Sequence, residues 1–213
     1  FSQLGIMGLC GKENTGHKNF VEYVLRTFEK NSDKYPVKVV IFDDVNRKFE
    51  CFSKLSIVEG YTLDIESISD LISDWHKVLQ NRYNNLMEQG DIGENKELLL
   101  LIVQNNDVAK KISENFDLMD KFNEILSKYK GMNVAIIFSN YNNASLSYDA
   151  PEPLRIIKQE QHIIFFEDLD NLKTFDVPYE DIRANKKRLE KGDAYYIQDN
   201  IVTKLKIVKA EIK

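Results

Sequence analysis

The start of the chain constrains the fold most strongly, because an apolar segment there runs into a glycine-bounded turn and then into an amphipathic segment. The apolar segment begins at Leu4, and Gly11 and Gly16 bound the turn. After the turn, apolar side chains recur at spacings of three and four residues up to about Lys30, which predicts a helix. A strand, a tight turn and a helix in this order are typical of the first unit of an α/β fold.

The turn has the frame of a phosphate-binding loop, G-x-x-x-x-G-K-[S/T]. In this motif backbone N–H groups surround the phosphates, the lysine reaches the β- and γ-phosphates, and the hydroxyl group holds Mg²⁺. The glycines have the separation that the motif requires, but histidine and lysine follow the second glycine. The candidate phosphate-binding positions are Gly11, Asn14, Thr15, Gly16, His17 and Lys18.

Both departures from the motif weaken the chemistry of the loop. His17 is shorter than lysine and, with an unperturbed pKa of about 6.5, mostly neutral at cellular pH. Lys18 stands where the hydroxyl ligand of Mg²⁺ belongs, and an ammonium group has no lone pair for a cation. Using Lys18 as the phosphate lysine would turn the side chain by about 100° around the helix. A plain strand-to-helix connection is an equally good interpretation of the glycine pattern alone.

Strand and helix patterns alternate along the rest of the chain. Glu97–Val103 and Asn133–Phe138 are continuous apolar runs, as expected for central parallel strands covered on both faces. The other predicted strands are Val37–Asp44, a short one before Gly60 within Asn46–Tyr61, Leu154–Ile157, His162–Glu167, and a hairpin of Ala194–Ile197 and Val202–Lys209 joined at Asp199-Asn200. The other predicted helices are Asp64–Met87 with Asp64 as its cap, Asp107–Lys130, and Tyr179–Leu189.

This alternation predicts an α/β fold with a doubly wound, mostly parallel central sheet and a C-terminal β-hairpin. No segment rich in Pro, Gly or Ser divides the chain, so residues 1–213 are expected to form a single domain. Because the chain enters a strand almost at Phe1, we expect this domain to belong to a longer protein.

Composition excludes several classes of protein. The 213 residues are 43% hydrophobic and 30% charged, which is typical of a globular domain rather than a disordered chain. The net charge of −5 argues against a nucleic-acid-binding surface. The two cysteines give neither a disulfide framework nor a metal-binding spacing, as expected in a reducing compartment. The longest apolar run, Leu98–Val103, is too short to span a bilayer.

An ATPase with such a loop also needs a second, acidic motif. An aspartate at the end of a central strand holds Mg²⁺, and a following glutamate often orients the attacking water. The strand in the right place ends instead at Gln104 and Asn105, whose amides bring no charge. Asp107 is expected to cap the next helix, and Asp43 and Asp44 to face solvent or cap a turn. Two independent departures at the two required places favour loss of ATP hydrolysis.

Five other features carry weaker functional signals. His76 lies on the predicted long helix and is expected to be a solvent-facing or half-buried histidine rather than a ligand. His162 has no Cys or acidic partner at metal-ligand spacing, so we predict no metal site, and Cys10 is expected to be a small buried hydrophobe. The polar run Asn140–Tyr148 follows a central strand and is either a binding loop or a plain surface loop. The basic run Asn185–Lys191 is expected to be a solvated helix face or a subunit contact.

Three stretches together resemble the RecA-like ATPase modules of the FtsK/SpoIIIE type, and most of all the C-terminal module of type VII secretion motors. The first is the strand, loop and helix of Leu4–Phe28. The second is Gly131–Asn140, similar to the family's strand that ends in a polar sensor segment. The third is Leu189–Ile197, similar to the family's late Leu-x-x-Gly segment and followed by the closing strand Val202–Ala210. Their order and spacing extend over nearly the whole chain.

The resemblance implies a RecA-like P-loop NTPase fold and a module of a membrane-anchored motor on the cytoplasmic side of the plasma membrane. Implied partners are other ATPase domains of the same chain, a hexameric assembly, and secreted WXG100-like substrates and effectors, with membrane contact only through the rest of the parent chain. By position, the loop residues above correspond to the phosphate loop, Gln104 and Asn105 to the acidic motif, and Ser139 and Asn140 to the sensor segment.

Two functional hypotheses follow from these observations. The first is a degenerate module that hydrolyses no ATP, has no catalytic residues and no resident cofactor, and acts in substrate recognition and regulation of export. The second is a weak or partner-dependent ATPase that binds ATP and Mg²⁺ with Lys12 or Lys18 as the phosphate contact. A Rossmann-type enzyme is disfavoured because the chain lacks a G-x-G-x-x-G fingerprint.

Overall fold

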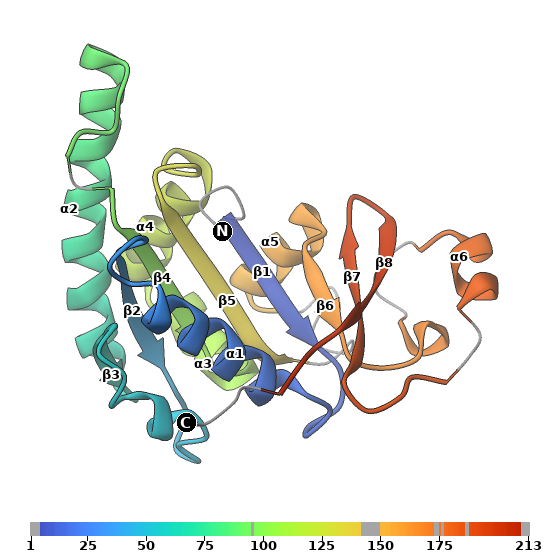
Figure 1. Ribbon diagram of the computed structural model, residues 1–213. Coiled ribbons are helices and arrows are strands. Elements are labelled where there is room, and N and C mark those ends of the chain that lie inside the picture. Colours follow the sequence, from blue (N-terminus) through green and yellow to red (C-terminus); the bar gives the residue numbers. More distant parts are fainter. Residues whose placement is uncertain are drawn as a thin grey trace.

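The computed structural model describes residues 5–94, 96–141, 150–172, 175, 177–185 and 188–209. Its centre is an 8-stranded sheet with the order β3-β2-β4-β5-β1-β6-β7-β8 (Figure 1). The strands are β1 Gly5–Cys10, β2 Val37–Phe42, β3 Val58–Thr62, β4 Leu98–Val103, β5 Val134–Tyr141, β6 Ile163–Phe165, β7 Asp193–Gln198 and β8 Ile201–Lys206. The helices are α1 His17–Lys30, α2 Ile65–Gln89, α3 Asn106–Glu114, α4 Phe116–Ser127, α5 Glu152–Glu160 and α6 Tyr179–Ala184, with short 3₁₀ turns at Glu50–Phe52 and Leu169–Asn171.

The sheet is parallel from β3 to β6 and antiparallel from β6 to β8. The hairpin of β7 and β8 turns at Asp199 and Asn200, whose φ angles of 49° and 64° are those of a two-residue type I′ turn. The predicted mostly parallel, doubly wound sheet with a C-terminal β-hairpin is therefore confirmed.

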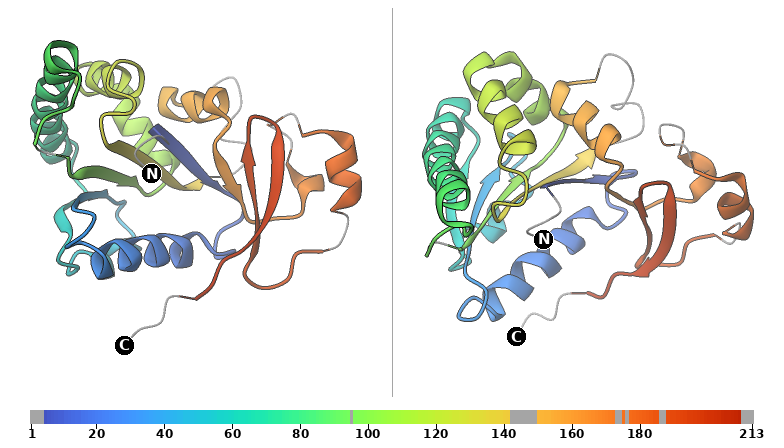
Figure 2. Two further views of the ribbon diagram at one scale, coloured as in Figure 1. Left: turned by 45° about the horizontal axis from the view of Figure 1, so that its top comes forward. Right: turned by 90° about the horizontal axis from the view of Figure 1, so that it is seen from above.

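Helices cover both faces of the sheet, as Figure 2 shows from above. One hydrophobic core lies under α1 and the 49–57 segment, and the other lies under α2, α3, α4 and α5. Strand β4 contributes to both, because Leu100 and Ile102 face the first core while Leu99 and Leu101 face the second. This double coverage explains why the central strands are apolar at every position rather than at alternate ones.

The long helix α2 is fixed at its start and near its end. At its start Asp64 accepts a hydrogen bond from the Ser67 backbone N–H at 2.8 Å, which confirms the predicted cap. Near its end the buried Arg82 guanidinium donates to the carbonyl oxygens of Met132 and Glu97 at 2.8 and 2.9 Å. These carbonyls precede β5 and β4, so one side chain links the helix to the amino ends of the two central strands.

The single helix predicted for Asp107–Lys130 is wrong, because two helices meet at Asn115. Asn115 has an extended conformation (φ −101°, ψ 102°), and its side chain accepts a hydrogen bond from the Leu118 N–H at 3.0 Å, which starts α4. The cap of α3 is Asn105 rather than the predicted Asp107, which lies in the first turn. At Asn115 a short polar side chain caps a new helix instead of continuing the old one, whereas Asn105 caps the start of α3 directly after β4.

The strand predicted at Leu154–Ile157 is also wrong, because these residues lie in helix α5. Pro151 precedes that helix, Pro153 lies in its first turn, and the buried Leu154 and Ile157 have helical spacing. Several element bounds differ more modestly. Strand β3 runs through Gly60 instead of ending before it, α6 ends at Ala184, and β8 ends at Lys206. Strand β2 ends at Phe42, β5 continues to Tyr141, and β6 is limited to Ile163–Phe165. Among the described residues, every helix is too short or too polar to cross a membrane.

Candidate functional site

The candidate site lies where four neighbouring parallel strands, β2, β4, β5 and β1, reach their carboxyl ends (Figure 1). In doubly wound sheets ligands bind at this edge. The segments that leave the strands carry Asp43 and Asp44, Gln104 and Asn105, and the Gly11–Gly16 loop, and Asn140 lies near the end of β5. The sheet therefore brings the predicted loop, acidic-motif and sensor positions to one edge.

The backbone conformation of the Gly11–Gly16 loop requires glycine at both ends. Both residues have φ of 141°, and a Cβ atom at Gly16 would lie 3.0 Å from the ring of Phe166, just after β6. Within the loop Asn14 has a left-handed φ of 64°, and the Thr15 hydroxyl donates to the Lys12 carbonyl oxygen at 2.7 Å. The loop is thus a tight, internally bonded turn between β1 and α1.

His17 fills the space that this loop encloses. It is the first residue of α1, and only 2% of it is exposed. Its ring packs against that of Phe166 with centroids 4.6 Å apart, and its Nε2 lies 3.4 Å from the place where a Cβ atom on Gly11 would be. The side chain is therefore folded across the loop, whereas a phosphate-binding lysine would extend toward a ligand.

The His17 ring is electrically neutral and short of hydrogen bonds. Burial lowers its pKa to about 4; Lys48 adds to this effect, and the nearby Asn140 amide and Glu13 offset part of it. Within the described part of the chain, neither ring nitrogen has a hydrogen-bond partner. The side chain at the position predicted for the phosphate lysine thus carries no positive charge at neutral pH.

Lys12 and Lys18, the two lysines considered as replacements for the phosphate lysine, are directed elsewhere. The Lys18 ammonium lies over the ring of Phe52, 5.6 Å from its centroid, and that of Lys12 is 3.5 Å from the Glu167 carboxylate. The first turn of α1 contains no acidic residue, and no side chain caps it. The backbone N–H groups at the start of α1 therefore remain the main positive feature of the loop.

The two predicted amide positions take part in separate contacts with neighbouring strand ends. Gln104 is fully buried, and its Oε1 accepts a hydrogen bond from Asn140 Nδ2 at 2.8 Å. Asn105 Oδ1 accepts from the Val108 N–H at 3.1 Å, which caps α3, and Asn105 Nδ2 donates to Asp44 Oδ2 at 2.5 Å. Among the described residues, Gln104 Nε2 has no partner. At this strand end, the position predicted for the acidic motif is therefore a neutral amide that accepts a hydrogen bond from Asn140.

A β-bulge in β5 accompanies the contact of Asn140 with Gln104. The register of β1 with β5 shifts from Gly8 opposite Phe138 to Cys10 opposite Tyr141, and Asn140 has a φ of 54°. Ser139 beside it is buried, and its hydroxyl has no partner within the described ranges. The rest of the predicted Asn140–Tyr148 loop, from residue 142, lies outside the described residues, as do residues 186 and 187 of the predicted basic run.

Asp43 and Asp44 belong to this edge, although neither was predicted as a site residue. Asp43 is fully buried, accepts hydrogen bonds from the Phe49 N–H at 2.7 Å and the Tyr61 hydroxyl at 3.1 Å, and has a pKa that burial raises. Asp44 accepts from the Asn46 N–H at 2.9 Å. The expectation that they cap a turn is confirmed, and the expectation that they face solvent is wrong. Their place at the end of a buried strand was the available signal.

Two cavities flank the Gly11–Gly16 loop. One, of 560 Å³, lies between the loop and the C-terminal hairpin, with Phe166, Lys191, Lys206 and Lys209 in its wall. The other, of 400 Å³, has His17, Lys18, Lys48 and Asn140 in its wall. Cys10, just before the loop, is fully buried as predicted, and burial raises the pKa of its thiol.

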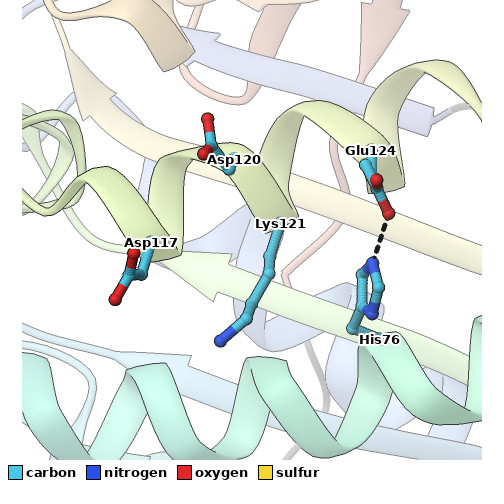
Figure 3. A pocket seen from close by; sticks show the side chains of 5 residues that line it. All are labelled: His76, Asp117, Asp120, Lys121 and Glu124. Atoms are coloured by element: carbon cyan, nitrogen blue, oxygen red, sulfur yellow. Dashed lines mark hydrogen bonds and ion pairs between the residues drawn. The ribbon is translucent and has the colours of Figure 1, made fainter.

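A separate cavity of 290 Å³ lies between α2 and α4 (Figure 3). His76 Nε2 and Glu124 Oε2 are 2.5 Å apart, and the Lys121 ammonium donates to the Ser73 hydroxyl at 2.6 Å. The side chain of His76 is 21% exposed, in agreement with the prediction of a half-buried helical histidine. This cluster joins the two helices, and it shares no lining residue with the cavities beside the loop.

Comparison with known proteins places the fold. Neither a family model nor a curated protein sequence matches the chain. Solved structures do match, among them EssC (ATPases 2 and 3) from Geobacillus thermodenitrificans, with a TM-score of 0.78, 16% identity, and coverage of 97% of this chain and 37% of that one. EccC (ATPases 2 and 3) from Thermomonospora curvata, in complex with a signal sequence peptide, has a TM-score of 0.64 with 14% identity over 97% of this chain and 37% of that one.

A third match is the conjugation coupling protein TcpA of pCW3 with ATPγS, with a TM-score of 0.62, 10% identity, and coverage of 96% of this chain and 60% of that one. All three likenesses concern ATPases or nucleotide-bound relatives of that fold, so the predicted RecA-like P-loop NTPase fold is confirmed. The chain spans 37% of the length of the EssC structure, which contains ATPases 2 and 3.

Proposed function

We propose that this chain is a non-hydrolysing ATPase-fold module of a type VII secretion motor, equivalent to the C-terminal module of an EssC protein. It would work on the cytoplasmic side of the plasma membrane, beside other ATPase domains of the same chain and within a hexamer. The structural likeness to EssC and EccC modules supports this, together with the sequence resemblance at Gly131–Asn140 and Leu189–Ile197.

The observation that carries the loss of hydrolysis is the packing of His17 inside its own loop. Phosphoryl transfer depends on positioned positive charge, normally the loop lysine and Mg²⁺ held by a hydroxyl and an aspartate. Here the lysine position is a neutral, buried imidazole, the hydroxyl position is Lys18, and the aspartate position is Gln104. None of these three groups provides what the transition state requires.

Such a module would contribute recognition and regulation instead of turnover. The EccC structure from Thermomonospora curvata holds a signal sequence peptide, so ATPase modules of this fold can receive peptides. By analogy we assign to this module the recognition of secreted WXG100-like substrates and effectors, and the coupling of that event to neighbouring ATPase domains.

One observation favours the second hypothesis, a weak or partner-dependent nucleotide site. The 560 Å³ cavity beside Asn14–Gly16 is large enough for a small ligand and has Lys191, Lys206 and Lys209 in its wall. A nucleotide there would still lack a held Mg²⁺ ion, because no carboxylate follows β4 before Asp107. Binding without hydrolysis is the most that this arrangement supports.

Calorimetric titration with Mg·ATP and Mg·ADP tests the proposal. The wild type is expected to show no binding up to about 1 mM nucleotide, whereas His17→Lys/Lys18→Thr, which restores the loop sequence, should bind. Adding Gln104→Asp to the restored loop should then permit measurable hydrolysis. Tight binding by the wild type would contradict the proposal and favour the second hypothesis.

A further inference from the structure

We propose that the surface beside the disabled loop is a docking site for an acidic segment of a protein partner. This inference rests on the proposed function, because it assigns the edge of the loop to carboxylate groups instead of a nucleotide. The surface, here called the basic groove, is formed by Lys18, Arg47, Lys48 and Lys54. It comprises the 400 Å³ cavity beside the loop and an adjoining one of 530 Å³, which share Lys18 and Lys48.

The basic groove has an excess of positive charge on a chain whose net charge is −5. Among the described residues, its second cavity is lined by four cationic side chains and by Glu50 as the single carboxylate. Glu50 pairs with Arg47 at 2.8 Å, and Lys48 pairs with Glu13 at 2.9 Å, but both pairs are exposed and so hold their cations weakly. Within the described ranges, Lys18 and Lys54 make no ion pair.

The floor of the first cavity adds hydrogen-bond donors that have no acceptor. The first intrahelical bond of α1 runs from the Phe20 N–H to the Gly16 carbonyl, so the backbone N–H groups before Phe20 are open to the cavity wall formed by Gly16, His17, Lys18 and Asn19. His17 is buried there, and both of its ring nitrogens lack partners in the described part of the chain. Helix N–H groups and a buried unpaired side chain together point to an anionic ligand.

Carboxylates fit this site better than a nucleotide does. A nucleotide needs the interior of the loop, which His17 fills, and a Mg²⁺ ion, for which Lys18 offers no ligand atom. A carboxylate needs only ammonium groups and N–H donors at a surface. Because the groove extends over two adjoining cavities, an extended acidic peptide can contact Lys18 and Lys48 near the loop and Lys54 at the far end.

Fluorescence anisotropy with a fluorescein-labelled octaglutamate peptide at low salt tests this proposal. The wild type is expected to bind it, and Lys18→Glu and Lys48→Glu should each weaken binding at least about tenfold. Glu13→Gln removes a carboxylate that competes for Lys48 and should tighten binding about twofold. Lys110→Glu, on the exposed face of α3, changes the net charge equally and should leave the affinity within about twofold. Circular dichroism verifies that each variant is folded.

Several outcomes would overturn the docking site. Among them are the absence of peptide binding by the wild type, equal losses in Lys48→Glu and Lys110→Glu, and weaker binding by Glu13→Gln. An uncharged serine-glycine peptide of the same length that binds equally well would also overturn it. The calorimetric titration separates this failure from that of the proposed function, because tight Mg·ATP binding contradicts the function, whereas absent nucleotide and absent peptide binding contradict only the docking site.

Discussion

The two ends of β4 and β5 hold different kinds of buried polar side chain. At the amino ends Arg82 is 2% exposed, and its guanidinium donates to carbonyl oxygens of Met132, Asn133 and Glu97. At the carboxyl ends, within the described residues, His17 and Gln104 keep buried nitrogens that have no partner. Buried polar groups in proteins are nearly always paired, and exceptions gather at functional sites. The amino edge is therefore built for stability, and the carboxyl edge retains features of a site.

The largest expected change in stability comes from removing the Arg82 guanidinium at the amino ends of β4 and β5. Arg82→Leu would leave carbonyl oxygens before β4 and β5 without their donor and should lower the free energy of unfolding by about 3 kcal/mol. Urea denaturation measures this, with the exposed Arg155→Leu on α5 as the matched control, expected to change stability by less than about 0.5 kcal/mol. A loss below about 1 kcal/mol for Arg82→Leu would contradict the structural role assigned to that edge.

At the carboxyl ends of the strands, the buried His17 should make the free energy of unfolding depend on pH. The pKa of His17 is about 4 in the folded chain and about 6.5 when unfolded, so between these values the unfolded state binds more protons. Stability from this group is therefore complete above pH 6.5 and is lost as the pH falls toward 4, by up to about 3 kcal/mol. Unfolding free energies measured from pH 7 to pH 4 in wild type and His17→Phe isolate the effect, because only the variant lacks it. Parallel curves would rule out a buried neutral His17.

Removing the caps of α3 and α2 should reduce the stability of the protein by intermediate amounts. Asn105 caps α3 and also contacts Asp44, whereas Asp64 only caps α2. Asn105→Ala should cost about 2 kcal/mol of stability and Asp64→Ala about 1 kcal/mol. Thermal and chemical denaturation of both variants measure the difference. Equal losses would show that the Asn105 contact with Asp44 contributes nothing to the carboxyl edge.

The smallest expected effect is a gain in stability rather than a loss. His17→Phe keeps an aromatic ring against Phe166 and removes the two ring nitrogens that lack partners, so it should raise the unfolding free energy at pH 7 by about 1 kcal/mol. His17→Ala is the companion variant, and it should destabilise the chain because it leaves a cavity in the loop. A destabilising His17→Phe would mean that the ring nitrogens are satisfied in solution.

The sequence was sufficient for those features that depend on local pattern. The strand, loop and helix at Gly5–Lys30, the central strands and the Asp199-Asn200 hairpin were predicted because each has a spacing or turn signature that tertiary contacts do not override. The helix break at Asn115 was missed because a side-chain cap causes it, and the apolar spacing continues across it. The helix at Leu154–Ile157 was missed because its short apolar pattern fits a strand or a helix, and the two prolines at its start favour the helix.

The geometry of the site depends on contacts between distant segments, and so it could not be read from local pattern. The sequence indicates that His17 is a poor phosphate ligand, but its burial depends on Phe166 after β6, far along the chain. Likewise, the contacts of Gln104 with Asn140 and of Asn105 with Asp44 require the strand order β2-β4-β5, which only the assembled sheet provides.

The central claim is that a neutral His17 occupies the phosphate loop and keeps nucleotide out. The most direct measurement is an NMR titration of the imidazole signals, which is practicable because the chain has 3 histidines and His17→Phe identifies the signal of interest. Our account predicts that His17 titrates near pH 4, far below an ordinary histidine, and that millimolar Mg·ADP leaves its signals unchanged. Titration near pH 6.5, or a clear shift of the His17 signals with Mg·ADP, would contradict it.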